Sequence, residues 1–411
     1  MDWPSFDAAF EGCYTPDWGR PGKPIRLLVG LHYLKATFNE SDETVIERWL
    51  ENPYWQFFCG FEQFQHTCPI DPSNLSRWRT RVGPGKLETL LAQTVETAKA
   101  KKLVRPAQLE KVVVDTTVQE KAVAYPTDAR LFHKTRATLV REAKKRRISL
   151  RQSFDRLSRQ ALFRQHRLRH AGQTKKANRE VRRLKSYLRH VVRDLVRKTP
   201  WDDAPMKDLI YRAAQLIRQT REDKNKLYSF HAPEVACIGK GKAHKKYEFG
   251  AKVGLAITAR GNWVVGAHSF PGNPYDGHTL KASLTQVERI TRHAVTEALV
   301  DKGYRGHDAP SSVTVHIDNK ARNRTHWQRQ WMRRRSAVEP VIGHAKQDHR
   351  MGRNFLKGEN GDAANAILAA AGFNFRKLIR EYARIFLRLL SERLLRPHSQ
   401  PENRFALAHA A

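Results

Sequence analysis

The chain of 411 residues has few acidic residues and a large excess of basic ones. Its 41 Asp and Glu stand against 75 Lys and Arg, which gives a formal net charge of +34 and a pI of about 10.4. Such an excess opposes a compact state by self-repulsion unless a polyanion offsets it. Because nucleic acid is the usual polyanion, the composition predicts a nucleic-acid partner. A ribosomal or RNA-packaging protein is the simplest alternative.

Cysteine and long apolar runs are also scarce. The four cysteines (Cys13, Cys59, Cys68 and Cys237) form no C-x2-C pair, so they indicate neither a zinc site nor a redox motif. They suit a reducing compartment. No run of 18 apolar residues occurs, so we expect no membrane span. The opening MDWPSFDAAF lacks the basic and apolar parts of a signal peptide, and we therefore expect a cytoplasmic protein.

The first part of the chain, residues 1–105, is predicted to be a helical domain for DNA binding or dimerisation. In the segment DPSNLSRWRTRVG, Pro72 favours a helix start and Gly83 a helix end. This helix would present Arg77 and Arg79 beside Trp78. It is either a short DNA-contacting helix or an ordinary amphipathic helix with a solvated basic face.

A strongly basic block follows. Residues 130–198 contain 24 Lys and Arg but only 4 Asp and Glu, a net charge of +20. Within it, apolar residues recur every three to four positions from Val181 to Leu195, and arginines such as Arg182 and Arg189 occupy the other faces. This pattern predicts an amphipathic helix with an apolar seam and a basic surface. We assign residues 129–239 to a basic helical insertion that contacts the DNA backbone.

The strands predicted around this insertion define the fold class. The expected order is strand, helical insertion, two hairpin strands, helix, two strands and helices, which is the order of an RNase H-like fold with a mixed α/β sheet. The predicted segments are strands at 111–118, 247–258, 262–270, 297–303 and 311–318, and helices at 278–294, 333–344 and 362–390. The catalytic domain would comprise residues 106–128 and 240–395, and residues 396–411 are expected to be a disordered tail.

Two of these strands appear to end in an aspartate. Asp115 follows three valines, and Asp301 follows Leu299 and Val300. Charged groups directly after buried strands lie at the carboxyl edge of a sheet, where α/β sites form. Carboxylates that lie close together repel unless a cation neutralises them, and magnesium prefers such hard oxygen ligands. Two such ions can flank a phosphodiester, whereas no residue indicates a covalent nucleophile.

The third acid is expected from a helix. Arg335 lies one turn before Glu339 and Lys346 about two turns after it, so the three share a face. Alone, this arrangement is typical of a solvated ion pair. Pro340 and Gly343 are poor choices for a helix kept only for stability, and they favour a site that DNA approaches closely.

Other candidate ligands compete with these acids. Asp318 follows its strand as cleanly as Asp301 does and lies 21 residues before Glu339, against 38 for Asp301. An RNase H-like order needs one more strand between the second acid and the helix, which favours Asp301. Asp276 is expected to be a helix N-cap. The remaining candidates, expected to be structural or surface residues, are His244 and His278.

Taken together, Arg-x3-Glu-x6-Lys with VVVDTT and DKGYRG upstream resembles the DDE transposases of bacterial insertion sequences, nearest to the group conventionally numbered five. The segments HAPEVACIGKGKAHKKYEFGAKVGL and FPGNPYDGHTL are also similar to that group, so the resemblance covers almost the whole chain. It implies binding of terminal inverted repeats, cleavage at the ends and joining of the 3′-hydroxyls to target DNA. It also implies a homodimer on double-stranded DNA, at the nucleoid of a bacterial cytoplasm.

The resemblance also assigns roles to residues. It implies that Asp115, Asp301 and Glu339 are catalytic and bind two Mg²⁺ ions, for which Mn²⁺ could substitute. It implies that basic residues of the two motifs contact DNA near the scissile phosphate: Arg335, Lys346, Lys302 and Arg305.

The chain departs from the resembled pattern at two places. Met332 stands where a tyrosine is usual, so Trp327 or Trp331 would have to make that contact. The chain also reaches Trp3 without the usual leading segment, which suggests a shortened N-terminus. Two further functions stay open: a catalytically inactive nucleic-acid-binding derivative of a transposase, and a magnesium-dependent nuclease without strand transfer.

Overall fold

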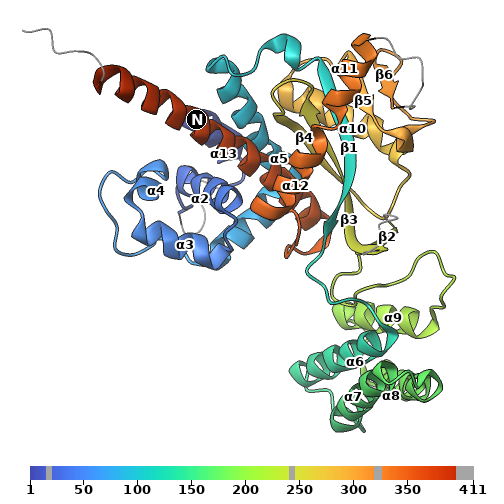
Figure 1. Ribbon diagram of the computed structural model, residues 1–411. Coiled ribbons are helices and arrows are strands. Elements are labelled where there is room, and N and C mark those ends of the chain that lie inside the picture. The colour runs from blue at the N-terminus through green and yellow to red at the C-terminus, as the bar shows by residue number, and fades with distance from the viewer. Residues whose placement is uncertain (15–20, 240–245, 319–325, 395–411) are drawn as a thin grey trace, which may run out of the picture.

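The computed structural model describes residues 1–14, 21–239, 246–318 and 326–394, and its centre is a mixed sheet of six strands (Figure 1). The strand order is β2-β3-β1-β5-β6, with β4 paired to β3. Strands β1, β5 and β6 are parallel, and β3 runs antiparallel to β1. The mixed α/β fold predicted from the sequence is therefore confirmed. The strands are β1 (Lys111–Glu120), β2 (Ala236–Gly239), β3 (Tyr247–Thr258), β4 (Val264–Phe270), β5 (Glu297–Val300) and β6 (Thr314–Ile317).

Strand β1 is longer than predicted, which changes the position of Asp115. Antiparallel pairing with β3 continues from Val112 to Glu120, whereas the parallel pairing with β5 ends at Val113. Asp115 therefore lies inside β1, and the prediction that it ends a strand is wrong. It does stand just beyond the parallel part of the sheet, where the carboxyl ends of β1 and β5 diverge.

The N-terminal helices share one hydrophobic core with the sheet. Tyr33 packs against Phe375 with ring centroids 5.0 Å apart. The buried Asn374 amide donates to Thr94 Oγ1 at 3.0 Å and to the Val264 carbonyl at 2.7 Å. Residues 1–105 therefore contribute to the same core as the sheet. The helices concerned are α1 (Trp3–Glu11), α2 (Ile25–Phe38), α3 (Asp42–Glu51), α4 (Pro53–Phe58), α5 (Pro72–Ala100) and α13 (Gly358–Leu394).

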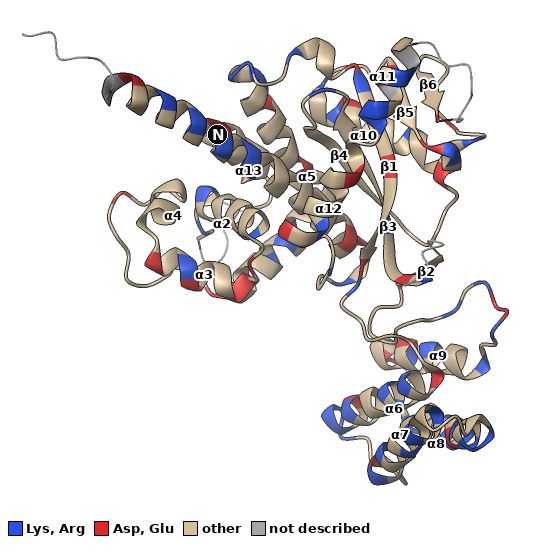
Figure 2. Ribbon diagram, viewed as in Figure 1, with Lys and Arg blue, Asp and Glu red and all other residues tan. Residues whose placement is uncertain are grey.

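The basic insertion is a bundle of four helices with a second core of its own, which includes Leu139, Leu188, Val191 and Leu216. Figure 1 shows this bundle set apart from the sheet, at the far end of β1. Lys and Arg are spread over its surface (Figure 2). Its helices are α6 (Asp128–Lys145), α7 (Asp155–His170), α8 (Thr174–Lys198) and α9 (Ala204–Arg218).

The chain returns to the sheet earlier than the predicted end of the insertion at residue 239. The edge strand β2 lies inside that range, because four residues are too short to give a clear alternating pattern. The remaining elements are η1 (Pro106–Gln108), η2 (Asp276–Thr279), α10 (Leu280–Thr291), η3 (Lys302–Tyr304), α11 (His326–Arg335) and α12 (Val338–Asp348). Helix α13 is described to Leu394, so the predicted tail lies outside the described residues. Of the described helices, none is both long and apolar enough to cross a membrane.

Candidate active site

Asp115 and Asp301 lie at the same level of two neighbouring strands. In the parallel pair β1–β5, Val113 stands opposite Leu299. Continuing this register by two residues places Asp115 level with Asp301, just beyond the last paired residues of the two strands. Their side chains are mostly shielded from solvent, with exposed fractions of 16% and 36%.

One guanidinium joins these two acids to a third. Arg335 Nη2 lies 3.6 Å from Asp115 Oδ2 and 3.8 Å from Asp301 Oδ2, and Arg335 Nη1 lies 3.8 Å from Glu339 Oε1. The three acids therefore meet around a single positive charge. Buried Arg335 Nε has no hydrogen-bond partner among the described residues. The guanidinium is thus held by charge rather than by a set of short hydrogen bonds.

Arg335 and Glu339 belong to two helices rather than the single helix predicted. Helix α11 ends at Arg335 and α12 begins at Val338. Pro340 falls in the first turn of α12, where backbone N–H groups have no intrahelical acceptor, so proline is tolerated there. Gly343 faces open space, since a Cβ built on it would have no atom within 4 Å. Glu339 is 65% exposed beside this open side.

Asp318 stands one strand further from Asp115 than Asp301 does. Val300 of β5 pairs with Ile317 of β6, and the Asp318 N–H donates to the Val300 carbonyl at 3.1 Å. Asp318 is thus level with Asp301 but two strand spacings, roughly 9.6 Å, from β1.

A fourth carboxylate lies beside the site. Asp276 Oδ1 accepts hydrogen bonds from Thr116 Oγ1 at 2.9 Å and from Lys252 Nζ at 2.8 Å. A Cβ on Gly303 would lie 3.0 Å from Asp301 Oδ1 and 3.1 Å from Asp276 Oδ2, so these carboxylates flank Gly303. Asp276 begins η2 but caps no helix, and the N-cap prediction is wrong.

A sequence signal for Asp276 existed and was missed. Lys252 is the one cation inside the apolar run GAKVGLAIT, and its side chain is only 8% exposed. A buried lysine in a central strand requires a carboxylate partner, because an unpaired buried charge is costly. The nearest acid after the hairpin is Asp276, in NPYDGH.

The pKa of the buried Tyr304 hydroxyl is affected by the negative charge of these acids. Burial raises the pKa of its hydroxyl, and the charges of Asp115, Asp276 and Asp301 raise it further, to well above its usual range. The ring is fully buried at the end of η3. Tyr304 therefore stays protonated and packs beneath the acids as a neutral group.

The other predicted DNA contacts lie on several surfaces. The predicted DNA contact of Arg79 is wrong, because its side chain is buried and donates to both carboxylate oxygens of Asp42 at 2.8 and 2.5 Å. Helical spacing alone could not show that α3 supplies this acid. Exposed basic residues among the predicted contacts are Arg77, Arg182, Arg189, Lys302 and Arg305, and Lys346 is half-buried.

Further residues named from the sequence fall partly outside the described ranges. His244 and the side chains of Trp327 and Trp331 lie outside the described residues. Met332 is half-buried, and exposed His278 packs edge-on against Tyr275.

The donor chemistry of the site fits a divalent cation, although its present arrangement holds a guanidinium. Three carboxylates supply hard oxygen ligands of the kind that magnesium and manganese bind. Within the described ranges, no group of three or more His, Cys, Asp or Glu side chains stands ready to hold a metal ion. Asp115, Asp301 and Glu339 are the residues that would hold one.

Comparison with known proteins defines the class. Residues 1–81 match the family described as Transposase domain (DUF772), and residues 286–379 match the family described as Transposase DDE domain. The second range contains Asp301, Arg335, Glu339 and Lys346. The chain belongs to the transposases that combine these two domains, and DDE transposases generally use divalent metals.

The chain is also similar to a protein of Rhizobium meliloti. The chain is 57% identical over 173 residues to the uncharacterized protein ORF8 in nfe locus of Rhizobium meliloti. This alignment covers 42% of the present chain and 83% of that protein. No solved structure matches the chain.

Proposed function

We propose that this transposase binds the terminal inverted repeats of a bacterial insertion sequence of group five, cleaves the DNA at the ends and joins the 3′-hydroxyls to target DNA. The observation that carries the proposal is the meeting of Asp115, Asp301 and Glu339 around Arg335. The strand order β4-β3-β1-β5-β6 supports an RNase H-like catalytic core. The site of action would be the nucleoid in the bacterial cytoplasm.

The three acids would hold two Mg²⁺ ions, with Mn²⁺ as a substitute. When bound, such ions activate the attacking water or 3′-hydroxyl and stabilise the leaving oxygen. Asp301 is preferred over Asp318 because it neighbours Asp115 directly and shares Arg335 with it. Asp115 and Asp301 come from the rigid sheet, and Glu339 closes the site from α12.

Arg335 and Lys346 would contact DNA beside the scissile phosphate. Arg335 lies among the three acids, and its guanidinium could donate hydrogen bonds to a phosphate held there. The open space beside Gly343 gives the backbone room to approach α12. Lys302 and Arg305, exposed on η3 and just after it, extend the same positive surface beyond Asp301.

The bundle α6–α9 would bind the DNA backbone away from the cut. Arg182 and Arg189 are exposed on α8, and the buried apolar residues of that helix pack in the bundle core. Association of two copies on paired ends is part of the proposal and rests on the resemblance to insertion-sequence transposases.

A cleavage and joining assay tests this function. Purified protein, Mg²⁺ and labelled duplex carrying the element's inverted repeat should give end cleavage and, with plasmid target, joined products. Asp115→Asn and Glu339→Gln should each lose both activities by more than about 100-fold, because loss of a metal ligand removes several kcal/mol of transition-state stabilisation. Undiminished cleavage by either variant would rule out the assignment.

Two other outcomes would favour the alternative functions. Cleavage without joined products would make the protein a metal-dependent nuclease. End binding without any nick by the wild-type protein would make it a catalytically inactive derivative.

A further inference from the structure

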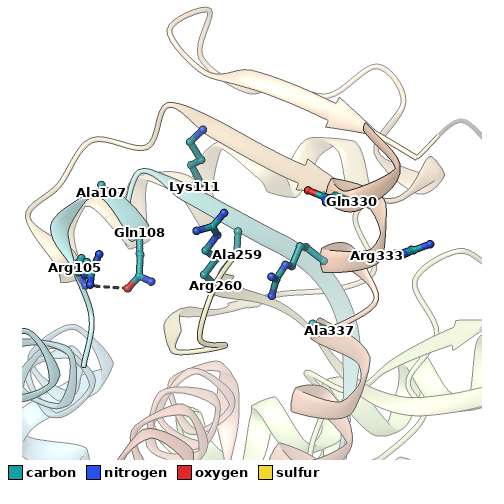
Figure 3. Close-up of a pocket in the computed structure, with 10 residues that line it drawn as sticks. Arg105, Ala107, Gln108, Lys111, Ala259, Arg260, Gln330, Arg333 and Ala337 are labelled. Carbon is teal, nitrogen blue, oxygen red and sulfur yellow. Dashed lines mark hydrogen bonds between the residues drawn. The ribbon is translucent and has the colours of Figure 1, made fainter. Parts of the chain in front are cut away.

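A cationic cavity lies between α11, the start of β1 and the turn that joins β3 to β4 (Figure 3). Its volume is about 770 Å³. Five of its ten lining residues are Lys or Arg and none is acidic, so the cavity is built to receive negative charge. The five are Arg105, Lys111, Arg260, Arg333 and Arg334.

Three of these cations have no carboxylate to neutralise them. Lys111 is already paired with Glu297 at 2.6 Å, and the Arg333 side chain points away from the cavity in Figure 3. Arg105, Arg260 and Arg334 are exposed, and they form no ion pair with the acids that the structure describes. Three uncompensated guanidinium groups around one cavity favour a phosphate-bearing ligand.

The remaining lining residues favour a nucleic-acid backbone over a base. Of the described lining residues none is aromatic, so none of them offers a ring face on which a base could stack. Of the two amides present, Gln108 already accepts the Arg105 backbone N–H at 2.9 Å. Ala107, Ala259 and Ala337 leave room but offer no hydrogen bonds. Recognition by charge without base contacts is how proteins position a phosphate backbone.

The cavity is adjacent to the acids. Arg334 directly precedes Arg335, which contacts Asp115 and Asp301. Lys111 precedes Asp115 by four residues of the same strand, or roughly 13 Å at about 3.3 Å per residue. A DNA strand rises about 3.4 Å per nucleotide along the helix axis and also winds around it, so this span covers at most about four nucleotides.

We propose that this cavity binds the phosphate backbone of one DNA strand within about four nucleotides of the scissile phosphate, through Arg105, Arg260 and Arg334. The position relative to the cut rests on the proposed function. Binding of the phosphates themselves does not.

Salt-dependent binding tests the contact at Arg260. The affinity of the full-length protein for inverted-repeat duplex is measured by fluorescence anisotropy between 50 and 200 mM salt. Losing one phosphate contact lowers the slope of log K against log salt by about 0.9. Raising the salt fourfold lowers the affinity of both proteins. The factor by which the affinity falls should be about 3.5 times smaller for Arg260→Gln than for the wild type. Arg260→Lys keeps the charge and should keep most of the slope.

A matched control and a phosphate scan locate the contact. Arg292 is an exposed arginine in a different hollow, beside Met1 and Glu96, and Arg292→Gln should leave the slope unchanged. Neutral methylphosphonates are then placed singly at the first six phosphates on each side of the cut. At least one within about four nucleotides should weaken the wild type and leave Arg260→Gln unaffected.

The outcomes separate this inference from the proposed function. An unchanged slope for Arg260→Gln, or an equal change for Arg292→Gln, would overturn the cavity assignment while end cleavage stands. A reduced slope in a protein that never cleaves DNA would uphold phosphate binding and defeat the proposed chemistry. A methylphosphonate effect only at distant positions would contradict the placement beside the cut.

Discussion

At the scale of single residues, Asp276 and Lys252 form an ion pair beside the acid site. Lys252 is almost fully buried and donates to Asp276, which also accepts from Thr116, the neighbour of Asp115. Removing the carboxylate would leave a buried ammonium with only the Pro274 carbonyl as acceptor among the described residues. The pair therefore couples stability to the position of Asp115.

Asp276→Asn should lower the free energy of unfolding by about 1–3 kcal/mol, because it leaves Lys252 buried without a counter-charge. Adding Lys252→Met should restore part of that loss, measured as the coupling energy of a double-mutant cycle in urea unfolding. Glu392→Gln, which breaks an exposed pair with Arg388, is the control and should change little. Strictly additive losses from the two substitutions would show that the pair is not coupled.

Arg79 and Arg77 should behave differently, although they were predicted to act together. Arg79 is buried against Asp42, and Arg77 is exposed. Although burial raises the pKa of Asp42, Arg79 and Lys35 hold it well below its usual range. Arg79→Ala should therefore cost roughly 3 kcal/mol of unfolding free energy. Arg77→Ala should cost almost none, and equal losses in the two variants would contradict the burial of Arg79.

At the scale of elements, α2 contributes a buried histidine, His32, beside the ion pair of Arg79 and Asp42. His32 Nδ1 lies 2.7 Å from the Leu28 carbonyl, and Nε2 lies 3.2 Å from Arg79. Burial first, and the charge of Arg79 second, lower the pKa of His32 to about 3. The imidazole is therefore neutral in the folded protein, where it donates to Leu28 and accepts from Arg79.

This histidine predicts loss of stability in mild acid. In the unfolded chain its pKa is about 6.5, so between about pH 6.5 and 3 the unfolded state binds the extra proton. The free energy of unfolding should fall by about 2 kcal/mol from this residue between pH 7 and 5. Chemical denaturation at several pH values checks the slope. His32→Gln should flatten it over that interval, and an unaltered slope would mean that His32 is not buried neutral.

The elements themselves were predicted well where pairing is local. The hairpin strand at 247–258 has its predicted bounds, because its apolar run GAKVGLAIT is long and contains a single charged residue, Lys252. The predictions were wrong where contacts with a distant segment of the chain determine the structure. The antiparallel partner β3 extends β1 past Asp115. Thr116 and Asp276, 160 residues apart, meet only in the folded chain.

The break between α11 and α12 has a local signal in the sequence, which is Pro340. The prediction of one helix over residues 333–344 is wrong here, because Pro340 lies in the first turn of a second helix. The three acids were nevertheless predicted, from strand order and from the resemblance to DDE transposases. The sequence could not indicate that Arg335 would lie between them, because helix packing on the sheet sets that position.

At the scale of the whole molecule, the charge is divided between two bodies. The sheet and the N-terminal helices share one core, and the basic bundle has another. Figure 2 shows Lys and Arg on both, so a DNA duplex bound at the acids has positive surface near the site and on the bundle. Composition predicted this partner directly. The division into two cores depends on which apolar seams meet, and the bundle closes on its own.

The central claim is that Asp301, rather than Asp318, completes the acid site with Asp115 and Glu339. The most direct measurement is end cleavage of inverted-repeat duplex by Asp301→Asn and Asp318→Asn, side by side in Mg²⁺ and Mn²⁺. The account predicts a loss of more than about 100-fold for Asp301→Asn, and cleavage within a few fold of wild type for Asp318→Asn. The reverse order, or full activity of Asp301→Asn, would contradict it.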